Sequence, residues 1–254
     1  MNLLVRTAFD GLAFHGTQIQ PGGVDTFQGL MEKLLSKIYD QPIRIRCSSR
    51  LDAKVSARDF CFSFVAPDTI EPERLMNYLN TQTESSVRVR KIVRVSDGFD
   101  ARGTPHCKEY LYTLDLGIYN PILDSHAWPI YKPLDRDLLI EALNRFVGTH
   151  DFRSFASSDS KNPNEDFRSS IDFIKTSFSK GGKLCRILIR GWAFHRYQVR
   201  LMVGAAARIA MGKDPVEIID RRLEDPDLDC VKVKAPPEGL LLWHTIYRGE
   251  VERC

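Results

Sequence analysis

The sequence predicts an α+β protein made of two ferredoxin-like βαββαβ units, whose antiparallel sheets flank a central cleft. Hydrophobic residues make up 43% and charged residues 27% of the 254-residue chain, which is typical of a globular protein. Short runs of β-branched and aromatic residues alternate with helical patterns in the first half, and the second half repeats this order more loosely. We therefore expect one unit over residues 1–98 and another over residues 99–254.

The first unit follows the order β-α-β-β-α-β. The apolar run Leu3–Phe9 predicts a strand, and Asp25 and Thr26 followed by Gln28 predict the start of a helix that ends before Pro42. Alternating or helical spacing predicts the remaining elements: strands at Ile43–Cys47, Phe60–Val65 and Val87–Val95, and a helix at Pro72–Leu79. Both helices would cover one face, which leaves the strand arginines on a helix-free face like that of RRM-type domains.

The second unit is predicted from weaker patterns. Strands are indicated at Tyr110–Leu116, Ile171–Phe178, Leu184–Ile189 and Leu240–Tyr247, and helices at Leu134–Val147 and Tyr197–Met211. A stretch rich in Ser, Asp and Asn between Ser154 and Ser170 is expected to be a mobile loop.

Charge and cysteine content narrow the class of protein. The 36 Lys and Arg exceed the 33 Asp and Glu by three, and many basic residues cluster: Arg44, Arg46, Arg50, Lys54 and Arg58, then Arg88, Arg90, Lys91 and Arg94, then Lys108, Arg190, Arg196 and Arg200. Such clusters suit a phosphate-binding face, although charge alone fits solvated surfaces equally well. The six cysteines are scattered without C-x-x-C pairs, which favours reduced thiols over disulfides or zinc. No apolar run has membrane-helix length and no secretory signal is evident, so we expect a cytoplasmic protein.

Three segments carry candidate chemistry. In the loop Ser48–Ala53, Asp52 could act as a nucleophile or general base, or could simply cap a turn. In the segment Trp192–Gly204, Arg196 and Arg200 have the spacing of one helix face; a packed Arg200 would need a carboxylate partner, whereas surface arginines would not. His195 in that segment fits a structural hydrogen bond as well as a catalytic role. Tyr110 and Tyr112 project from one strand face, as core residues or as a stacking platform.

Together, these segments resemble a known family. Seven motifs occur in order: Ala8–Gly11 with Phe14–Gly16, Thr26–Gly29, Arg50–Ala53, Phe99–Arg102 with Lys108–Tyr110, Gly148–Phe155, Phe194–Gly204, and Ala235–Leu240. Each motif is weak by itself, but their order and spacing over nearly the whole chain resemble the TruA-type tRNA pseudouridine synthases. The resemblance implies the pseudouridine synthase fold, with an RNA-binding cleft between the two units.

The resemblance also implies an activity and roles for residues. Uridine in the tRNA anticodon stem-loop (family positions 38–40) would be isomerised: the N1–C1′ bond breaks, the uracil rotates, and C5 rejoins C1′. Asp52 would be the catalytic carboxylate, held ionised by Arg200, with Tyr110 stacked on the uracil. Arg50 would help extrude the nucleotide and Leu240 would line the pocket. Lys54, Arg58 and His195 are further candidates for substrate binding. No metal, ATP or redox cofactor is implied, and the partners are tRNA and a second copy of the chain.

The active loop departs from the family pattern. Leu51, Lys54 and Ser56 replace its threonine, glycine and histidine, and Thr17 replaces a tryptophan. If the glycine position needs a left-handed backbone, lysine there costs about 1–2 kcal/mol. Two alternatives therefore stay open: a tRNA-binding paralogue that has lost catalysis, and a ferredoxin-like metabolic or ligand-binding protein without RNA.

Overall fold

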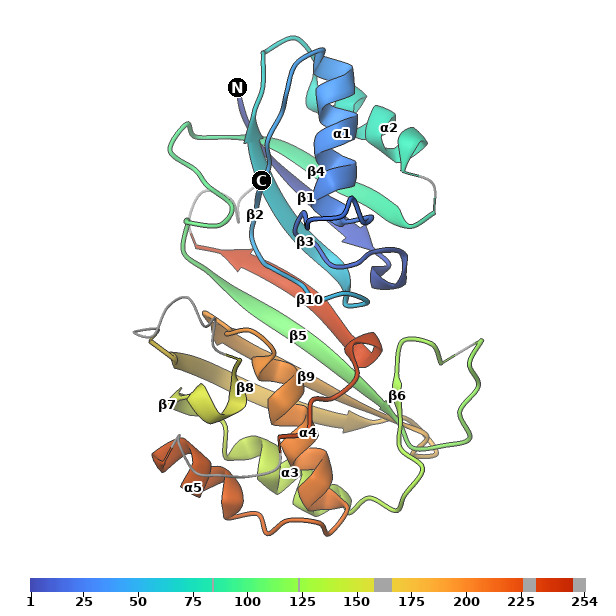
Figure 1. The fold of residues 1–254 in the computed structure, drawn as a ribbon, viewed down its shortest axis with the longest axis vertical. Helices are drawn as coiled ribbons and strands as arrows, with labels where there is room; N and C mark the ends of the chain where they lie inside the picture. Colours follow the sequence, from blue (N-terminus) through green and yellow to red (C-terminus); the bar gives the residue numbers. More distant parts are fainter. Residues whose placement is uncertain (84, 123, 158–165, 226–231, 249–254) are drawn as a thin grey trace. The chain divides into compact units, whose positions relative to one another are not determined.

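The computed structural model describes residues 1–83, 85–122, 124–157, 166–225 and 232–248. The chain divides into two compact units (Figure 1). The first comprises Met1–His106 together with the C-terminal segment from Leu241, and the second comprises Cys107–Leu240. Both combine helices with a sheet, so the predicted α+β class is confirmed. Within the described residues, no helix is both long and apolar enough to cross a membrane.

The first unit has a sheet with the strand order β4-β1-β3-β10. Its elements are β1 (Asn2–Phe9), α1 (Phe27–Tyr39), β2 (Arg46–Cys47), β3 (Ser56–Val65), α2 (Pro72–Gln82), β4 (Val87–Val95) and β10 (Leu240–Tyr247). Strand β1 is antiparallel to both neighbours, whereas β10 runs parallel to β3. Both helices lie on the same face of the sheet (Figure 1).

An aromatic cluster fixes the face that the helices cover. The Phe27 ring of α1 lies 4.6 Å from that of Phe9 and 5.0 Å from that of Phe60, measured between centroids. Side chains alternate along a strand, so Arg6 and Cys61, which are paired across β1 and β3, belong to the opposite, helix-free face. This helix-free face is where the sequence predicts the strand arginines.

That prediction is confirmed for some arginines and wrong for others. Arg46 pairs with Ser63 on the helix-free face, and Arg88 and Arg90 are exposed there, as argued below. Arg44 instead bonds Glu32 of α1 at 2.6 Å. Arg94 reaches Asp68 and Glu71 near the start of α2, at 3.1 and 3.2 Å. Alternation within a strand does not distinguish these two groups, because it does not show which acids lie within reach of each arginine.

Only the last two residues of the predicted strand Ile43–Cys47 form a strand, β2, because side chains of α1 bond the backbone before it. Ile43 and Ile45 are buried, as period-two spacing requires, but their N–H groups bond side chains of α1. The Ile43 N–H donates to Ser36 Oγ at 2.9 Å and the Ile45 N–H to Glu32 Oε1 at 3.1 Å. These side chains take the place of the ladder partner that a strand would have.

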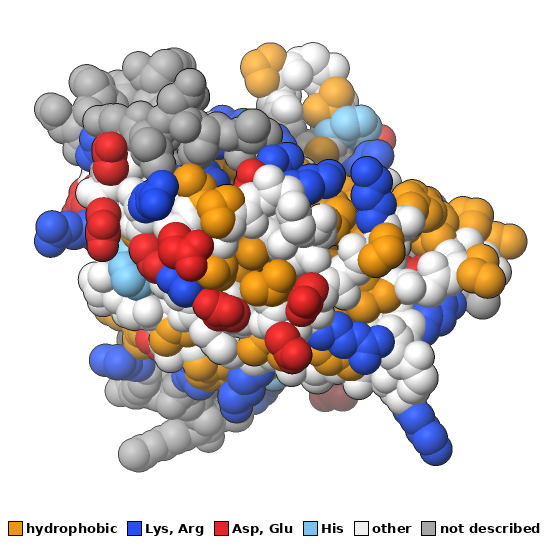
Figure 2. Space-filling view, turned by 90° about the horizontal axis from the view of Figure 1, so that it is seen from below, with side chains coloured by type: hydrophobic (Ala, Val, Ile, Leu, Met, Phe, Trp, Pro, Cys, Tyr) orange, Lys and Arg blue, Asp and Glu red, His pale blue; other side chains and the backbone are white. Residues whose placement is uncertain are grey.

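The second unit has the antiparallel order β5-β9-β8-β7. Its elements are β5 (His106–Asp115), β6 (Trp128–Pro129), α3 (Arg136–Asn144), β7 (Gly148–Asp151), β8 (Arg168–Phe178), β9 (Leu184–Trp192), α4 (Gln198–Ala210) and α5 (Ile218–Glu224). On its surface, Arg145 bonds Glu141 at 2.8 Å and also contacts Asp220. Figure 2, seen from below, likewise shows acidic and basic side chains interspersed with apolar ones.

Several features differ from the sequence-based expectation. The terminal strand β10, which we expected to close the second unit, pairs with β3 of the first. Sequence order does not specify such a long-range pairing. Strand β7 and helix α5 are additional elements, and residues 158–165 of the expected mobile loop lie outside the described residues. The assignment of domains to residues 1–98 and 99–254 stays a prediction.

The described cysteines are free thiols, as expected. They are Cys47, Cys61, Cys107 and Cys185, whereas Cys230 and Cys254 lie outside the described residues. Burial raises the pKa of Cys61 to about 12, so this thiol stays protonated at neutral pH.

Candidate active site

In the first unit, Asp52 opens a tight turn. The Val55 N–H donates to the Asp52 carbonyl at 3.2 Å, and Lys54, the third residue of the turn, has φ +68°. The turn therefore does need a left-handed residue, and here a lysine adopts that conformation. Asp52 is half-buried and Lys54 is exposed.

Thr17 and two glycines fix the backbone before and beneath this turn. The Leu51 N–H donates to Thr17 Oγ1 at 2.9 Å, and the Thr17 N–H donates back to the Leu51 carbonyl at 3.1 Å. A Cβ on Gly16 would lie 3.0 Å from the Leu51 oxygen, and one on Gly11 only 2.3 Å from the Val55 carbonyl. Both positions therefore require glycine for close approach of the backbone, and the loop holds Asp52 in a defined place.

The candidate cations around this loop differ in how they are held. Arg50 and Lys54 are exposed. Arg58, in β3, is half-buried; its Cζ lies 4.3 Å from the centroid of the Trp243 ring and its guanidinium contacts His244 Nε2. The sequence analysis did not single out Trp243 or His244, because their strand is far away in the chain and carries no motif at those positions.

In the second unit, Arg200 occupies the first turn of α4. It is only 6% exposed, and its Nε donates to the Ala235 carbonyl at 2.8 Å. The Ala235 N–H donates to the Arg200 carbonyl at 3.0 Å. Both backbone polar groups of Ala235, in the segment before β10, are therefore bonded to this arginine. The expectation that Arg196 shares its helix face is wrong: α4 begins at Gln198, and Arg196 is exposed and donates to the Tyr197 hydroxyl at 2.9 Å.

Tyr110 and Leu240 are also buried in this unit, each with 6% exposure. The Tyr110 ring meets Phe194 edge-on at 5.0 Å between centroids. Tyr112 is a core residue: its hydroxyl donates to the Pro236 carbonyl at 2.7 Å, and burial raises its pKa. The hydrogen bonds of Tyr112 and Arg200 thus hold the chain that leads to Leu240.

His195 is positioned by its backbone. Its N–H donates to Gln198 Oε1 at 2.9 Å, and its ring lies against Phe167 at 5.3 Å between centroids. Gln198, which the sequence analysis missed, also bonds Ser169 at 3.1 Å and so links this loop to β8. No group of three or more His, Cys, Asp or Glu among the described residues could hold a metal ion.

The candidate residues therefore fall into two separate groups. Asp52, Arg50, Lys54 and Arg58 belong to the first unit, and Tyr110, His195, Arg200 and Leu240 to the second. The ion pair between Asp52 and Arg200 joins different units and stays a prediction. An ionisable carboxylate on a fixed turn can attack a carbon centre or remove a proton, and nearby cations suit a polyanion.

Comparison with known proteins defines the class first. The family model described as tRNA pseudouridine synthase matches residues 142–248. The chain is 31% identical to tRNA pseudouridine synthase A of Aquifex aeolicus (strain VF5), over 95% of this chain and 97% of that protein. It is 35% identical to that of Akkermansia muciniphila, over 96% and 94% of the two chains. A solved Cbf5-Nop10-Gar1 complex is similar with a TM-score of 0.39 at 12% identity, over 82% of this chain and 44% of that chain, too distant to bear on function.

The similarity to these relatives covers nearly the full length of both chains. The same holds for tRNA pseudouridine synthase A of Brachyspira hyodysenteriae, which is 30% identical over 98% of this chain and 99% of that protein. The chain therefore belongs to the tRNA pseudouridine synthase A family, and the resemblance found in its motifs is confirmed.

Proposed function

We propose that this chain isomerises uridine to pseudouridine in the anticodon stem-loop of tRNA, at family positions 38–40, with Asp52 as the essential carboxylate. Membership of the family makes it an isomerase that modifies uridine in tRNA. The observation that carries the role of Asp52 is its turn: it is the only acid between Ser48 and Val55, on a backbone fixed by Thr17 and two glycines. Isomerisation needs a group that acts on the base or sugar, and a positioned carboxylate serves either route.

The remaining candidates receive roles that their surroundings support. Arg200 would pair with Asp52 and hold it ionised, which its burial and its fixed Nε favour. Tyr110 would stack on the flipped uracil and Leu240 would line the pocket. The exposed Arg50 would help extrude the nucleotide, which costs a few kcal/mol. Lys54, Arg58 and His195 would contact the RNA around it.

Three further expectations follow from this function. The macromolecular substrate is tRNA, and a homodimer would grip it with two clefts. No cofactor is required by the proposed chemistry. An enzyme that modifies tRNA works where tRNA is used, which supports a cytoplasmic location.

The direct test is tritium release from C5-labelled uridine in bulk tRNA. The wild-type protein should release tritium, and Asp52→Asn should reduce release by about a thousandfold or more. Asp97→Asn is the matched control, because Asp97 is an exposed acid in another loop of the same unit. It should retain wild-type release.

Two outcomes would contradict the proposal. Tight tRNA binding by the wild type without release would indicate the paralogue that has lost catalysis. Neither binding nor release would favour a protein without an RNA partner. Mapping pseudouridine in RNA from cells with and without the gene tests the position, which should fall in the anticodon stem-loop.

A further inference from the structure

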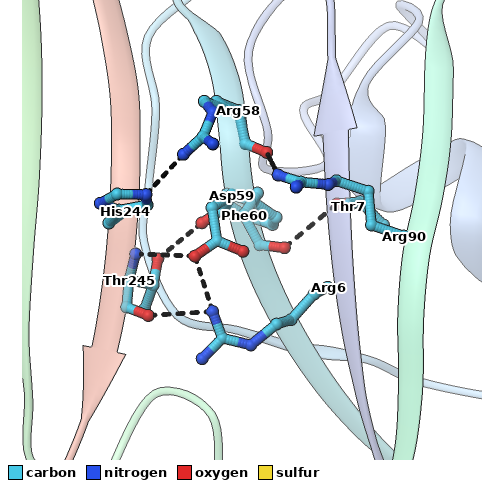
Figure 3. A network of polar contacts seen from close by, with 8 residues as sticks. All are labelled: Arg6, Thr7, Arg58, Asp59, Phe60, Arg90, His244 and Thr245. Atoms are coloured by element: carbon cyan, nitrogen blue, oxygen red, sulfur yellow. Dashed lines mark hydrogen bonds and ion pairs between the residues drawn. The ribbon is translucent and has the colours of Figure 1, made fainter.

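The helix-free face of the first unit carries a buried carboxylate, Asp59, one oxygen of which is bound by two donors (Figure 3). Asp59 Oδ2 lies 2.6 Å from the Arg6 guanidinium and accepts from the Thr245 N–H at 3.2 Å. Arg6 also donates to the Thr245 carbonyl at 3.2 Å, so β1, β3 and β10 are joined. The charge of Asp59 is thus neutralised by Arg6 and is not left to balance the cations around it.

Strand β4 adds three cations to this face through a bulge. Arg6 pairs with Lys91 and Thr7 with Val89, which leaves Arg90 as the extra residue. An extra residue interrupts the alternation, so the consecutive Arg90 and Lys91 both point away from the helices. Accordingly, Arg88, Arg90 and Lys91 are all exposed, while Val89 and Ile92 are buried.

Arg90 and Arg58 are held in position on this face. Thr7 pairs with Phe60 but Phe9 with Ala57, so β3 has an extra residue here and Arg58 shares the face of Asp59. The Arg90 guanidinium crosses β1 and donates to the Arg58 carbonyl at 3.0 Å (Figure 3). Arg58 itself packs over Trp243 and contacts His244. Guanidinium groups fixed in this way lose little further side-chain freedom when they bind an anion. We refer to Arg58, Arg88, Arg90 and Lys91 as the basic strip.

The basic strip lies at the same end of the sheet as the Asp52 turn. Strand β3 begins directly after the turn, and its first residue, Ser56, accepts from the Gly11 N–H at 2.9 Å. The Asp10 N–H donates to the Ser86 carbonyl at 2.9 Å, immediately before β4 begins. The turn, the end of β1 and the start of β4 therefore adjoin, and Arg58 and Arg88 lie two residues or fewer into their strands.

We propose that the basic strip is a second RNA-binding surface, which contacts the sugar–phosphate backbone of the tRNA outside the nucleotide being modified. The inference rests on the proposed function for the identity of its ligand. Fixed arginines with exposed basic neighbours, at the same end of the sheet as the Asp52 turn, suit an RNA backbone that continues past the modified nucleotide at this end of the unit. The face of the second unit that Figure 2 shows carries acidic and basic side chains mixed together instead.

The test compares two double variants that remove the same charge. Arg88→Gln with Arg90→Gln alters the basic strip. Lys37→Gln with Arg74→Gln alters exposed positions on α1 and α2, on the other face. Dissociation constants for full-length tRNA are measured across about 50–200 mM salt. The strip variant should bind roughly tenfold more weakly, and its salt dependence should fall by about one per lost phosphate contact.

The control pair should keep wild-type affinity and salt slope, and thermal unfolding verifies that both variants are folded. Unchanged binding by the strip variant would overturn the inference, and the arginines would then only protect the edge strand β4 from association. An equal loss in both variants would overturn it too, since net charge alone would explain it. Failure of the proposed function is distinguishable, because then the wild type would release no tritium.

Discussion

The two units hold their candidate residues in opposite ways. In the first unit, Asp52 lies half-buried on a turn that is held by backbone hydrogen bonds and by the Thr17 hydroxyl, with Leu51 and Val55 buried on either side. In the second, Arg200 and Tyr110 are themselves part of the packed interior. The chemistry of the first unit should therefore be separable from its stability, whereas in the second unit the two should be coupled.

The largest difference between the effect on turnover and the effect on stability is expected at Asp52. Asp52→Asn keeps the size of the side chain, and the backbone hydrogen bonds of the turn and of the residue before it are made with backbone groups and with Thr17 Oγ1, which the substitution does not remove. Turnover should fall by about a thousandfold or more, while the free energy of unfolding changes by less than about 0.5 kcal/mol. RNA affinity, measured with the same tRNA, should stay nearly unchanged. A loss of binding as large as the loss of turnover would contradict the assigned role.

Arg200 should show the coupled behaviour. Arg200→Ala removes the donor to the Ala235 carbonyl and leaves a cavity, which should cost about 2–4 kcal/mol of unfolding free energy. Turnover should fall severely as well, because the carboxylate loses its predicted partner. Denaturant unfolding gives the first quantity, and single-turnover assays well below the unfolding temperature give the second. Unchanged turnover in the folded variant would refute the ion pair.

A smaller difference between the two units is expected in how much one carboxylate–arginine pair of each contributes to stability as pH changes. Asp214 lies 2.5 Å from Arg208 in the second unit, and this hydrogen bond lowers the pKa of Asp214. A carboxyl with a lowered folded-state pKa stabilises the protein above its unfolded pKa of about 3.9, and this contribution is lost as pH falls through the folded value. Asp214→Asn should therefore cost about 1 kcal/mol or less at pH 7 and progressively less below pH 4 in denaturant titrations.

The first unit offers the matched pair, Arg46 and Asp100, at 2.9 Å. Burial opposes the shift, but hydrogen bonds from Arg46 and the Arg102 backbone lower the pKa of Asp100. Asp100→Asn should therefore also lower the free energy of unfolding at pH 7, but by less than Asp214→Asn does. The reason is that the Arg46 side chain is 61% exposed, against 19% for Arg208. A larger effect at Asp100 would mean that exposure does not govern these pairs.

Local signals were enough to predict most of the elements. Thr26 does cap α1, accepting from the Gly29 N–H at 3.3 Å, as its position before a helical pattern predicts. Long-range features were not predictable. The pairing of β10 with β3 and the covering of the Ile43–Cys47 segment by α1 depend on contacts between distant residues. The bulge at Arg90 likewise follows from register across strands, which alternation within one strand does not reveal.

The candidate site shows the same limit. The motifs identified Asp52, Tyr110 and Arg200, because each lies in a local pattern. Spacing alone placed Arg196 on the helix with Arg200, but Tyr197 has φ +64° and the helix starts only after it. Trp243 was not found, because its partner Arg58 lies far away in the sequence.

The smallest predicted effect is at Lys54, where the comparison can be made within one residue. At φ +68°, a lysine costs about 1–2 kcal/mol relative to a relaxed backbone. Glycine removes that strain, but its greater conformational entropy in the unfolded chain costs about 0.5–1 kcal/mol on folding. Lys54→Gly should therefore raise the free energy of unfolding by about 0.5 kcal/mol. Lys54→Gln keeps the strain and removes the charge, so the difference in unfolding free energy between Lys54→Gly and Lys54→Gln reports the backbone effect.

Both variants lose the predicted phosphate contact of Lys54 and should weaken RNA binding alike, by a few-fold at low salt. Denaturant unfolding and salt-dependent binding, measured on the same two proteins, separate the backbone effect from the charge effect. If Gln stabilised the protein as much as Gly, the cost would lie in the charge of Lys54 and not in its backbone. If neither variant weakened binding, the lysine would occupy the turn without touching the RNA, and the family's glycine position would matter here for folding alone.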